Sequence, residues 1–330
     1  MRILFAGSPA IAVPCLERLI VEGKKSGNPV VGVLTNPDTA KGRHGAALPT
    51  EVASAAEVFA QGPGALAIVK MEKLNAEARK AVATLKADIL VSFAYGHIFG
   101  PKFLALFPKG GINIHPSLLP KYRGATPIPS AILAQERETG ISIQRLALDM
   151  DAGDLLVQDR FALDPRSTTM SLSAQVADRA AELLVEVLRD ISAGTEKTWK
   201  QDAGLATYCS QIQKEDGRID WKESSASIDA QIRAYTPWPL SFTSLNGQIL
   251  FILEAEPYEG SFIAPEPSSK EPGFVLGIDK GAGILVQTGE GLLALKRLQF
   301  SSKKALDWRS FLNGARDFIG NKLDVSTGGK

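Results

Sequence analysis

The sequence predicts an α/β fold, with a doubly wound, mostly parallel sheet followed by a smaller OB-like β-barrel domain. Over residues 1–191, short apolar runs alternate with segments of helical periodicity, which indicates parallel strands joined by crossover helices. From residue 211 onward the expected strands are short and separated by frequent turn residues, as in a small antiparallel barrel. The chain has 330 residues, which is enough for two domains.

The elements of the first domain follow from these patterns in chain order. The apolar run Arg2–Ala6 predicts a strand, and in the turn that follows it Ser8 is expected to cap a helix whose first residue is Pro9. That turn lacks the G-x-G-x-x-G spacing, so a dinucleotide is not implied. Further strands are expected at Val30–Thr35, Ala65–Val69, Asp88–Phe93, Gly111–His115, Ile141–Leu148 and Leu155–Ala162. Helices are expected at Ala10–Glu22, Thr50–Ala60, Glu72–Lys86, Pro127–Ala134 and Met170–Ile191.

The character of the sequence changes after Ile191. Residues 192–210 are polar and include Lys197 and Lys200, so we expect a linker between a first domain (1–191) and a second (211–330). In the second domain, strands are expected at Ile249–Ala255, Gly273–Ile278, Gly283–Gln287 and Gly291–Leu298.

The composition is that of an ordinary globular protein, with 45% hydrophobic and 22% charged residues. The formal net charge is +1, so any surface that binds a nucleic acid must be local. Cys15 and Cys209 have no metal-ligand spacing, and we expect reduced thiols in a cytoplasmic protein. No apolar stretch reaches the roughly 18 residues of a membrane-spanning helix.

Two polar residues, Asn113 and His115, lie at the end of an apolar strand. Successive side chains of a strand point to opposite faces, so a spacing of two places both on the same side. An amide and an imidazole at the carboxyl end of a parallel strand can stabilise a carbonyl oxygen as it gains charge, which indicates acyl-type transfer. The alternative is a pair that only satisfies backbone groups. The segment that follows favours the functional interpretation, because Pro116 and Pro120 fix the chain as it leaves the sheet and Ser117 adds a hydroxyl.

Three carboxylates lie in the segment Asp149–Asp154, directly after an expected strand. An EF-hand that starts at Asp149 would need Gly at its sixth position and Glu at its twelfth, but Asp154 and Arg160 stand there. Calcium binding is therefore excluded, and one carboxylate turned toward a cleft is the better interpretation. A carboxylate beside an imidazole raises the imidazole pKa and favours its charged form.

Three basic segments could contact an anion or an RNA backbone. They are Lys121–Arg123, the loop 36–49 that holds Lys41 and Arg43, and Lys296–Arg316 in the second domain. Each could equally be a solvated turn, a flexible surface loop or an exposed helix.

Together, these motifs resemble the family of formyltransferases that use 10-formyltetrahydrofolate. The resemblance is carried by Asn113-x-His115, Ser117-Leu118-Leu119-Pro120, Arg123-Gly124 and Asp151-x-Gly153-Asp154. It covers nearly the whole chain, from Phe5-Ala6-Gly7-Ser8-Pro9 through Ala94-Tyr95-Gly96 to Tyr235-Thr236-Pro237-Trp238-Pro239. The last of these segments and the second domain are similar to the branch of the family that formylates methionyl initiator tRNA.

The resemblance implies transfer of the formyl group of 10-formyltetrahydrofolate to the α-amino group of methionyl initiator tRNA, for translation initiation. It implies that Asn113 and His115 stabilise the tetrahedral oxyanion, and that Asp151 keeps His115 oriented and protonated. Folate contacts are expected at Ser117, Leu118, Leu119, Pro120, Tyr95 and Asp149. Contacts with tRNA are expected at Arg43, Lys41 and Arg123, with the second domain as the tRNA-binding domain. We further expect a cytoplasmic monomer without a metal.

The chain departs from the family where His44-Gly45-Ala46-Ala47 follows Arg43, because the family usually carries lysines there. Two other functions stay open on the sequence alone. The same catalytic motif would serve a formyltransferase that acts on an amino-sugar nucleotide. A non-catalytic tRNA-binding protein on an enzyme fold is the third possibility, and the intact Asn113, His115 and Asp151 argue against it.

Overall fold

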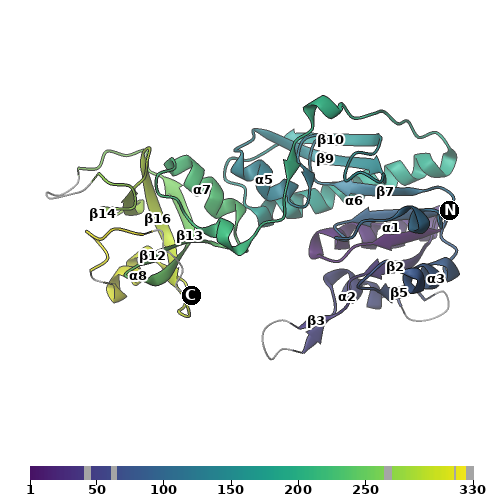
Figure 1. Cartoon of the computed structure of the whole chain (residues 1–330), viewed down its shortest axis with the longest axis horizontal. Helices are drawn as coiled ribbons and strands as arrows, with labels where there is room; N and C mark the ends of the chain where they lie inside the picture. Colours follow the sequence, from purple (N-terminus) through teal and green to yellow (C-terminus); the bar gives the residue numbers. More distant parts are fainter. Residues whose placement is uncertain (41–45, 61–64, 264–269, 316, 325–330) are drawn as a thin grey trace. The chain divides into compact units, whose positions relative to one another are not determined.

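The computed structural model describes Met1 to Asp324 except for residues 41–45, 61–64, 264–269 and 316. Its contacts divide the chain into two units (Figure 1). The first unit comprises Met1–Pro127, Glu138–Ala162 and Leu172–Ser210, and the second comprises Ile128–Arg137, Leu163–Ser171 and Gln211–Lys330. The first unit thus continues to Ser210, beyond the domain end expected at Ile191, and the second includes two segments that precede the expected linker.

A seven-stranded sheet forms the centre of the first unit, in the order β10-β9-β7-β6-β1-β2-β5 (Figure 1). The strands from β7 to β5 are parallel to one another, whereas β9 and β10 form an antiparallel edge. The mostly parallel sheet predicted from the sequence is confirmed. Its strands are β1 Ile3–Ala6, β2 Val30–Thr35, β5 Ala67–Lys70, β6 Ile89–Phe93, β7 Gly111–His115, β9 Glu138–Arg145 and β10 Leu155–Ala162.

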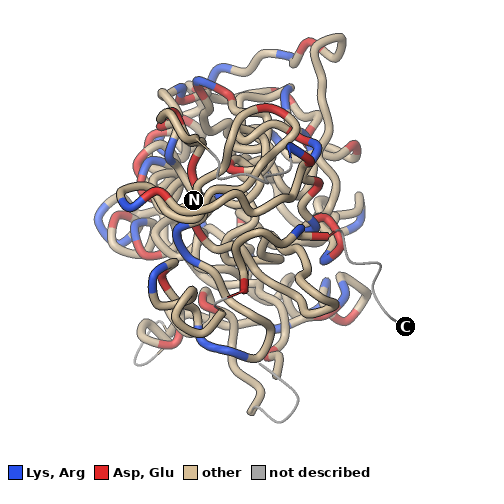
Figure 2. The backbone as a smooth tube through the Cα atoms, turned by 90° about the vertical axis from the view of Figure 1, so that its left-hand side faces the viewer, with Lys and Arg blue, Asp and Glu red and all other residues tan. Residues whose placement is uncertain are grey.

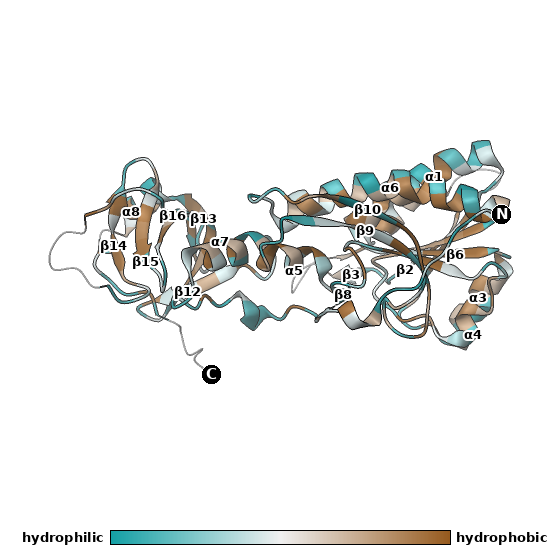
Figure 3. Cartoon of the chain, turned by 90° about the horizontal axis from the view of Figure 1, so that it is seen from above, coloured by the Kyte–Doolittle hydropathy of each residue, from teal (hydrophilic) through white to brown (hydrophobic). Residues whose placement is uncertain are grey.

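The helices of the first 200 residues are amphipathic or short. The longest, α6 (Thr169–Ala193), buries one face, and in Figure 3 teal and brown residues alternate along its length. Thr50 and Asn75 cap α2 and α3, each accepting a backbone N–H at 3.0 Å. The other helices are α1 Val13–Ser26, α2 Glu51–Glu57, α3 Ala76–Thr84, α4 Pro101–Leu104 and α5 Pro127–Leu133, and the minor strands are β3 Thr39–Ala40, β4 Ala47–Leu48 and β8 Arg123–Gly124.

Ser8 does not cap the first helix. A short 3-10 turn, Ala10–Ala12, precedes α1 and has no side-chain cap. The Ser8 hydroxyl instead lies 3.3 Å from the Thr35 hydroxyl and accepts the Asn36 N–H at 3.2 Å. It therefore joins the turn after β1 to the end of β2, a tertiary contact that a local capping rule does not anticipate.

The second unit contains an antiparallel sheet in the order β12-β13-β16-β15-β14, with β17 paired to β16. Its strands are β12 Ser241–Leu245, β13 Gln248–Pro257, β14 Val275–Asp279, β15 Gly283–Gln287, β16 Leu292–Phe300 and β17 Leu306–Asp307. The expected antiparallel β domain is confirmed, but the sequence analysis missed β12 and the two helices α7 (Ser225–Ala234) and α8 (Trp308–Gly314). One core of buried side chains, including Trp221, Ile252 and Phe311, joins these helices to the sheet.

The end of the described chain closes this sheet. Ser244 in β12 forms an antiparallel bridge with Asp324, and Phe274, which precedes β14, forms one with Lys322. Residues 322–324 therefore connect the two edge strands of the sheet. Closure of this kind removes exposed strand edges and makes a barrel.

The segment expected to be a linker, residues 192–210, is part of the first unit. Trp199 pairs with Leu155, the first residue of β10. Farther along, β11 (Tyr208–Cys209) runs parallel to β8. The segment is thus fixed by backbone hydrogen bonds to the loop that follows β7 and to the start of β10.

Charged residues of both signs are interspersed along the described chain (Figure 2), in keeping with the net charge of +1. No helix in the described ranges is long and apolar enough to cross a bilayer.

Candidate active site

Asn113 and His115 occupy alternate positions on β7, at the carboxyl edge of the parallel strands. β7 pairs with β6 on one side and with β9 on the other. Asn113 lies directly opposite Gln144 of β9, and His115 lies opposite Ser142. Directly opposed residues share a face of the sheet, so Asn113, His115 and Gln144 project to the same side.

Asp151 reaches the same point from the loop that follows β9. Its Oδ2 lies 3.5 Å from Nδ1 of His115, and its Oδ1 accepts a hydrogen bond from Nδ2 of Asn113 at 3.4 Å. The backbone φ of Asp151 is +53°, in the left-handed region that aspartate and asparagine tolerate better than most residues. The three residues predicted to be catalytic therefore converge.

Two further groups hold the Asp151 carboxylate. Nε2 of Gln144 donates to its Oδ1 at 2.9 Å, and the backbone N–H of Gly124 donates to its Oδ2 at 2.9 Å. Sequence reasoning missed both. The available signal was Gln144 within the strand expected at Ile141–Leu148, because a polar side chain that a strand buries requires a hydrogen-bond partner.

The protonation of His115 differs from the expectation. Burial lowers the pKa of His115 from its ordinary value of 6.5, and this outweighs the Asp151 charge and the Tyr122 hydrogen bond, which both raise it. Nε2 lies 2.7 Å from the Tyr122 carbonyl oxygen, so that nitrogen carries the proton of the neutral ring. Nδ1 is then the unprotonated nitrogen that faces Asp151. The prediction that Asp151 keeps His115 protonated is wrong for the resting site.

This shift gives the stability of the protein a pH dependence with a defined sign. The unfolded chain takes up a proton at His115 near pH 6.5, whereas the folded chain does so only at lower pH. Acidification below pH about 6.5 therefore favours unfolding, by at most about 1.4 kcal/mol per pH unit from this residue. We expect the free energy of unfolding in urea to fall less steeply for His115→Gln than for the wild-type protein between about pH 7.5 and about pH 5.5.

His97→Gln is the matched control, because it also removes one imidazole from the first unit but leaves His115 in place. Equal slopes in the wild-type protein and His115→Gln would contradict the lowered pKa of His115.

The segment expected to contact folate is largely fixed by bonds within the protein. The Ser117 hydroxyl donates to the Lys121 carbonyl oxygen at 2.6 Å, and Ser117 is 1% exposed. The Leu119 N–H donates to Ser142 at 3.0 Å, and the Leu119 carbonyl accepts from Gln158 at 2.8 Å. These groups shape the edge of the site, whereas Leu118 and Pro120 keep intermediate exposure.

Tyr95 and Asp149 lie in different environments. Tyr95 follows β6 at the same carboxyl edge as the site and is 2% exposed, and burial raises the pKa of its phenol to about 12. Among the described residues, its hydroxyl has no hydrogen-bond partner. His97 stacks against Tyr95 at a tilt and bonds to Asn36 at 2.8 Å. Asp149 is exposed.

The structure gives Arg123 a different role from the predicted tRNA contact. Its side chain is buried, and its guanidinium donates to Oε1 of Gln201 at 2.7 and 3.1 Å and to the Tyr208 hydroxyl at 3.4 Å. An arginine engaged in this way cannot reach a phosphate backbone, so we do not retain that prediction. Lys41 and Arg43 lie outside the described residues, and their predicted tRNA contacts stay predictions.

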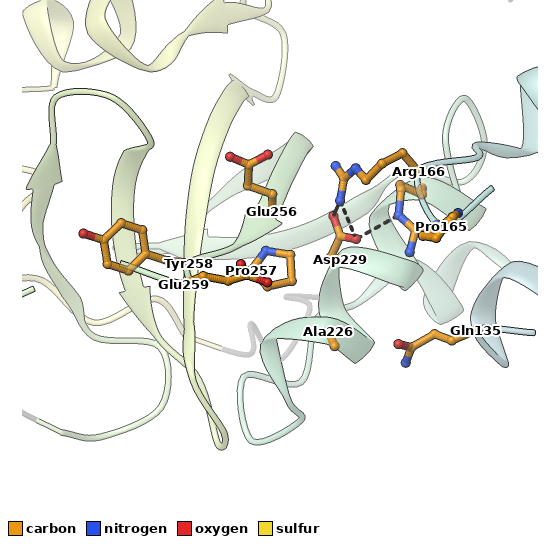
Figure 4. Close-up of a pocket in the computed structure, with 10 residues that line it drawn as sticks. Gln135, Pro165, Arg166, Ala226, Asp229, Glu256, Pro257, Tyr258 and Glu259 are labelled. Atoms are coloured by element: carbon orange, nitrogen blue, oxygen red, sulfur yellow. Dashed lines mark hydrogen bonds and ion pairs between the residues drawn. The ribbon is translucent and has the colours of Figure 1, made fainter. Parts of the chain in front are cut away.

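A second candidate site is a pocket of about 550 Å³ in the second unit (Figure 4). Arg166 and Arg233 converge there on Asp229, which is 3% exposed (Figure 4). The pocket also contains Glu256, which pairs with Lys296, and Glu259. The arginines are compensated internally, so this pocket has the character of a structural ion-pair cluster. In the described parts of the chain, no group of three His, Cys, Asp or Glu side chains is arranged to hold a metal.

Comparison with known proteins decides the family. Residues 1–188 match the formyl transferase family model, and residues 211–316 match the model of the formyl transferase C-terminal domain. The methionyl-tRNA formyltransferase of Treponema denticola is 45% identical over 97% of this chain and 98% of its own length. The chain belongs to the methionyl-tRNA formyltransferase family. It is therefore an enzyme that transfers a formyl group. Enzymes of this family take that group from a formylated tetrahydrofolate.

A more distant relative agrees with this assignment, and a solved structure agrees with the fold. The methionyl-tRNA formyltransferase of Chloroflexus aggregans is 39% identical over 95% of this chain and 97% of its own. An N-formyltransferase from Helicobacter canadensis, solved with folinic acid and dTDP-3-aminofucose, has the same fold at 22% identity. Its TM-score is 0.63, and the alignment covers 89% of this chain and 98% of that one.

Proposed function

We propose that Asn113, His115 and Asp151 catalyse formyl transfer from 10-formyltetrahydrofolate to the α-amino group of methionyl initiator tRNA. The observation that carries the assignment of these residues is their convergence. Two alternate positions of β7 bring an amide and an imidazole each within 3.5 Å of a carboxylate from the loop after β9. That set supplies a hydrogen-bond donor and a proton acceptor, the two functions that acyl transfer to an amine requires.

In the proposed reaction, the amine nitrogen forms a bond to the formyl carbon, and the formyl oxygen becomes an oxyanion. The bond between that carbon and N10 of the folate then breaks, N10 gains a proton, and the amine loses one. Asn113 is suited to bind the oxyanion because its bond to Asp151 is long at 3.4 Å, so its amide can turn toward a stronger acceptor.

His115 and Asp151 are suited to take up the proton from the amine. Nε2 of His115 already donates to the Tyr122 carbonyl oxygen, and Nδ1 faces the Asp151 carboxylate. A proton on Nδ1 would give both ring nitrogens an acceptor and pair the new charge with Asp151. The site therefore holds a neutral imidazole at rest and stabilises the imidazolium as it forms.

The folate is expected at the edge formed by Tyr95 and residues 117–120. The buried Tyr95 hydroxyl, with no partner among the described residues, supports this placement, because a polar group of a ligand would satisfy it. The initiator tRNA is the expected partner of residues 211–330, of Lys41 and Arg43, and of the exposed linker lysines Lys197 and Lys200. A monomeric state is part of this proposal.

The test is formylation of methionyl initiator tRNA by the purified protein with 10-formyltetrahydrofolate. The expected product is N-formylmethionyl-tRNA, at a higher rate than with methionyl elongator tRNA. A folded protein that transfers no formyl group would refute the proposal. Rapid formylation of an amino-sugar nucleotide, with no effect of added tRNA, would favour the amino-sugar alternative. The 45% identity to a curated tRNA enzyme over both domains makes that alternative the weaker one.

Asn113→Ala is expected to lower the kcat of formylation by about 10²–10³-fold, the usual effect of removing one oxyanion donor. The KM for both substrates should change little, because the amide acts on charge that develops only in the transition state. Steady-state kinetics with each substrate varied in turn checks both statements. A loss confined to KM would show that Asn113 binds substrate in its ground state instead.

A further inference from the structure

Two glutamines connect the Asp151 carboxylate to the segment 192–210. Gln144 is 2% exposed, and its Nε2 donates to Oδ1 of Asp151 at 2.9 Å. Nε2 of Gln201 donates to Oε1 of Gln144 at 3.1 Å, and also lies 2.8 Å from the backbone carbonyl oxygens of Asp151 and Gly153. All of these residues belong to the first unit.

The guanidinium of Arg123 determines which way the side-chain amides of Gln201 and Gln144 are turned. Arg123 has only donors, and two of its nitrogens face Oε1 of Gln201 at 2.7 and 3.1 Å. The amide nitrogen of Gln201 must therefore face Gln144, which in turn must present its own amide nitrogen to Asp151. The hydrogen bonds run in one direction, from Arg123 through Gln201 and Gln144 to the carboxylate.

We propose that Gln144 and Gln201 are positioning residues that hold Asp151 in its catalytic geometry, so that the segment 192–210 completes the active site. The inference rests on the proposed catalytic role of Asp151. Gln144 fixes the carboxylate, and Gln201 fixes the loop backbone on both sides of Ala152.

The backbone of Asp151 explains why such support is needed. Its left-handed φ of +53° is sparsely populated for any residue with a side chain, so the surrounding contacts must maintain it. Gln201 supplies two of those contacts from outside the loop, through the Asp151 and Gly153 carbonyl oxygens. Without them, the loop is free to relax and the carboxylate moves away from His115.

The first test replaces Gln144 by Met, which has a similar volume but no donor. We expect kcat to fall about 10- to 100-fold, the effect of losing a hydrogen bond to a charged group, with both KM values within about twofold. Gln175→Ala, at an exposed position of α6, is the matched control and should keep full activity. A Gln144→Met variant with normal kcat would overturn the role of Gln144.

Gln144→Glu adds a second measurement, the pH dependence of kcat, which would not change if Gln144 had only a structural role. Its carboxylate would face Asp151, whose charged and titratable neighbours are otherwise His115 and, through Gln201, Arg123. Two carboxylates in contact cannot both ionise freely, so the acid limb of the kcat–pH profile should shift to higher pH in this variant only. An unshifted profile would contradict the contact between Gln144 and the catalytic carboxylate.

Two variants of Gln201 test whether it positions the Asp151 loop or only attaches the segment 192–210 to Arg123. Gln201→Glu keeps an acceptor for Arg123 but presents oxygen to the Asp151 and Gly153 carbonyls, whereas Gln201→Ala loses both contacts. We expect both to lower kcat by about 10- to 100-fold while circular dichroism shows a folded protein. Normal activity of Gln201→Glu would overturn the proposal, because attachment through Arg123 would then suffice.

Asp151→Asn, measured in parallel, distinguishes failure of the proposed catalytic role of Asp151 from failure of the positioning role of the two glutamines. If Asp151→Asn keeps its activity, the proposed catalytic role fails, and the inference about the glutamines fails with it. If Asp151→Asn is inactive while the glutamine variants are normal, only the positioning role fails.

Discussion

Replacing Asp151 by Asn is expected to lower the kcat of formyl transfer by about 10³-fold or more, the range found when the carboxylate partner of a catalytic histidine is neutralised. Asn is the best probe because it tolerates the left-handed backbone at this position. The loss should therefore reflect chemistry rather than folding. The two carboxylate oxygens accept hydrogen bonds from the Gly124 N–H and from Nε2 of Gln144. In the Asp151→Asn variant an NH₂ group replaces one of these oxygens and cannot accept, so at least one of the two hydrogen bonds is lost.

Steady-state kinetics at saturating folate and tRNA measures this effect, and thermal unfolding confirms that the variant is folded. Asp178→Asn, at an exposed position of α6, is the matched control and should behave as the wild-type protein. Retention of more than about a tenth of the wild-type kcat in Asp151→Asn would refute the role of Asp151 in proton uptake.

Gly153→Ala is expected to destabilise the first unit by about 1–3 kcal/mol and to lower kcat by about 100-fold. Gly153 is buried, and a Cβ there would overlap the backbone carbonyl oxygen of Arg145, at the end of β9. That carbonyl cannot turn away cheaply, because it shares a peptide plane with the Leu146 N–H, which donates to the Gly111 carbonyl oxygen at 2.9 Å. The loop must therefore shift, and Asp151 must shift with it.

Thermal unfolding and kcat, measured on the same preparation, test this prediction. Gly100→Ala is the matched control, because a Cβ at Gly100 meets no atom within 4 Å and its φ is negative. If Gly153→Ala matches Gly100→Ala in both measurements, the close approach of the loop to β9 does not constrain the site.

Local patterns predicted the elements that carry the site with little error. The strands Gly111–His115 and Leu155–Ala162 have the bounds expected from the sequence, because turn residues border the apolar residues with which each strand begins. The spacing of Asn113 and His115 predicted a shared face, and the register of β7 against β6 and β9 is consistent with it. The elements missed in the second unit, β12, α7 and α8, are short, so their periodicity was too brief to distinguish helix from strand.

The same rules failed where a distant contact replaces a local one. Ser8 was expected to cap a helix but bonds to the end of β2, and Arg123 was expected to contact tRNA but is buried on Gln201. The protonation of His115 failed for a related reason. The Asp151 charge was foreseeable from the sequence, whereas the burial that outweighs it depends on the strands and loops packed around the ring.

The sequence by itself determined the parallel sheet, the antiparallel second domain and the three residues assigned to catalysis, because period-2 and period-3.6 patterns and short motifs are local properties. Only the tertiary structure decided how Asp151 is held. Gln144 lies on a neighbouring strand, Gly124 in a different loop, and Gln201 in a segment 50 residues farther along the chain than Asp151. None of these hydrogen bonds leaves a periodicity in the sequence, since each arises only when strand register and loop path bring the partners together.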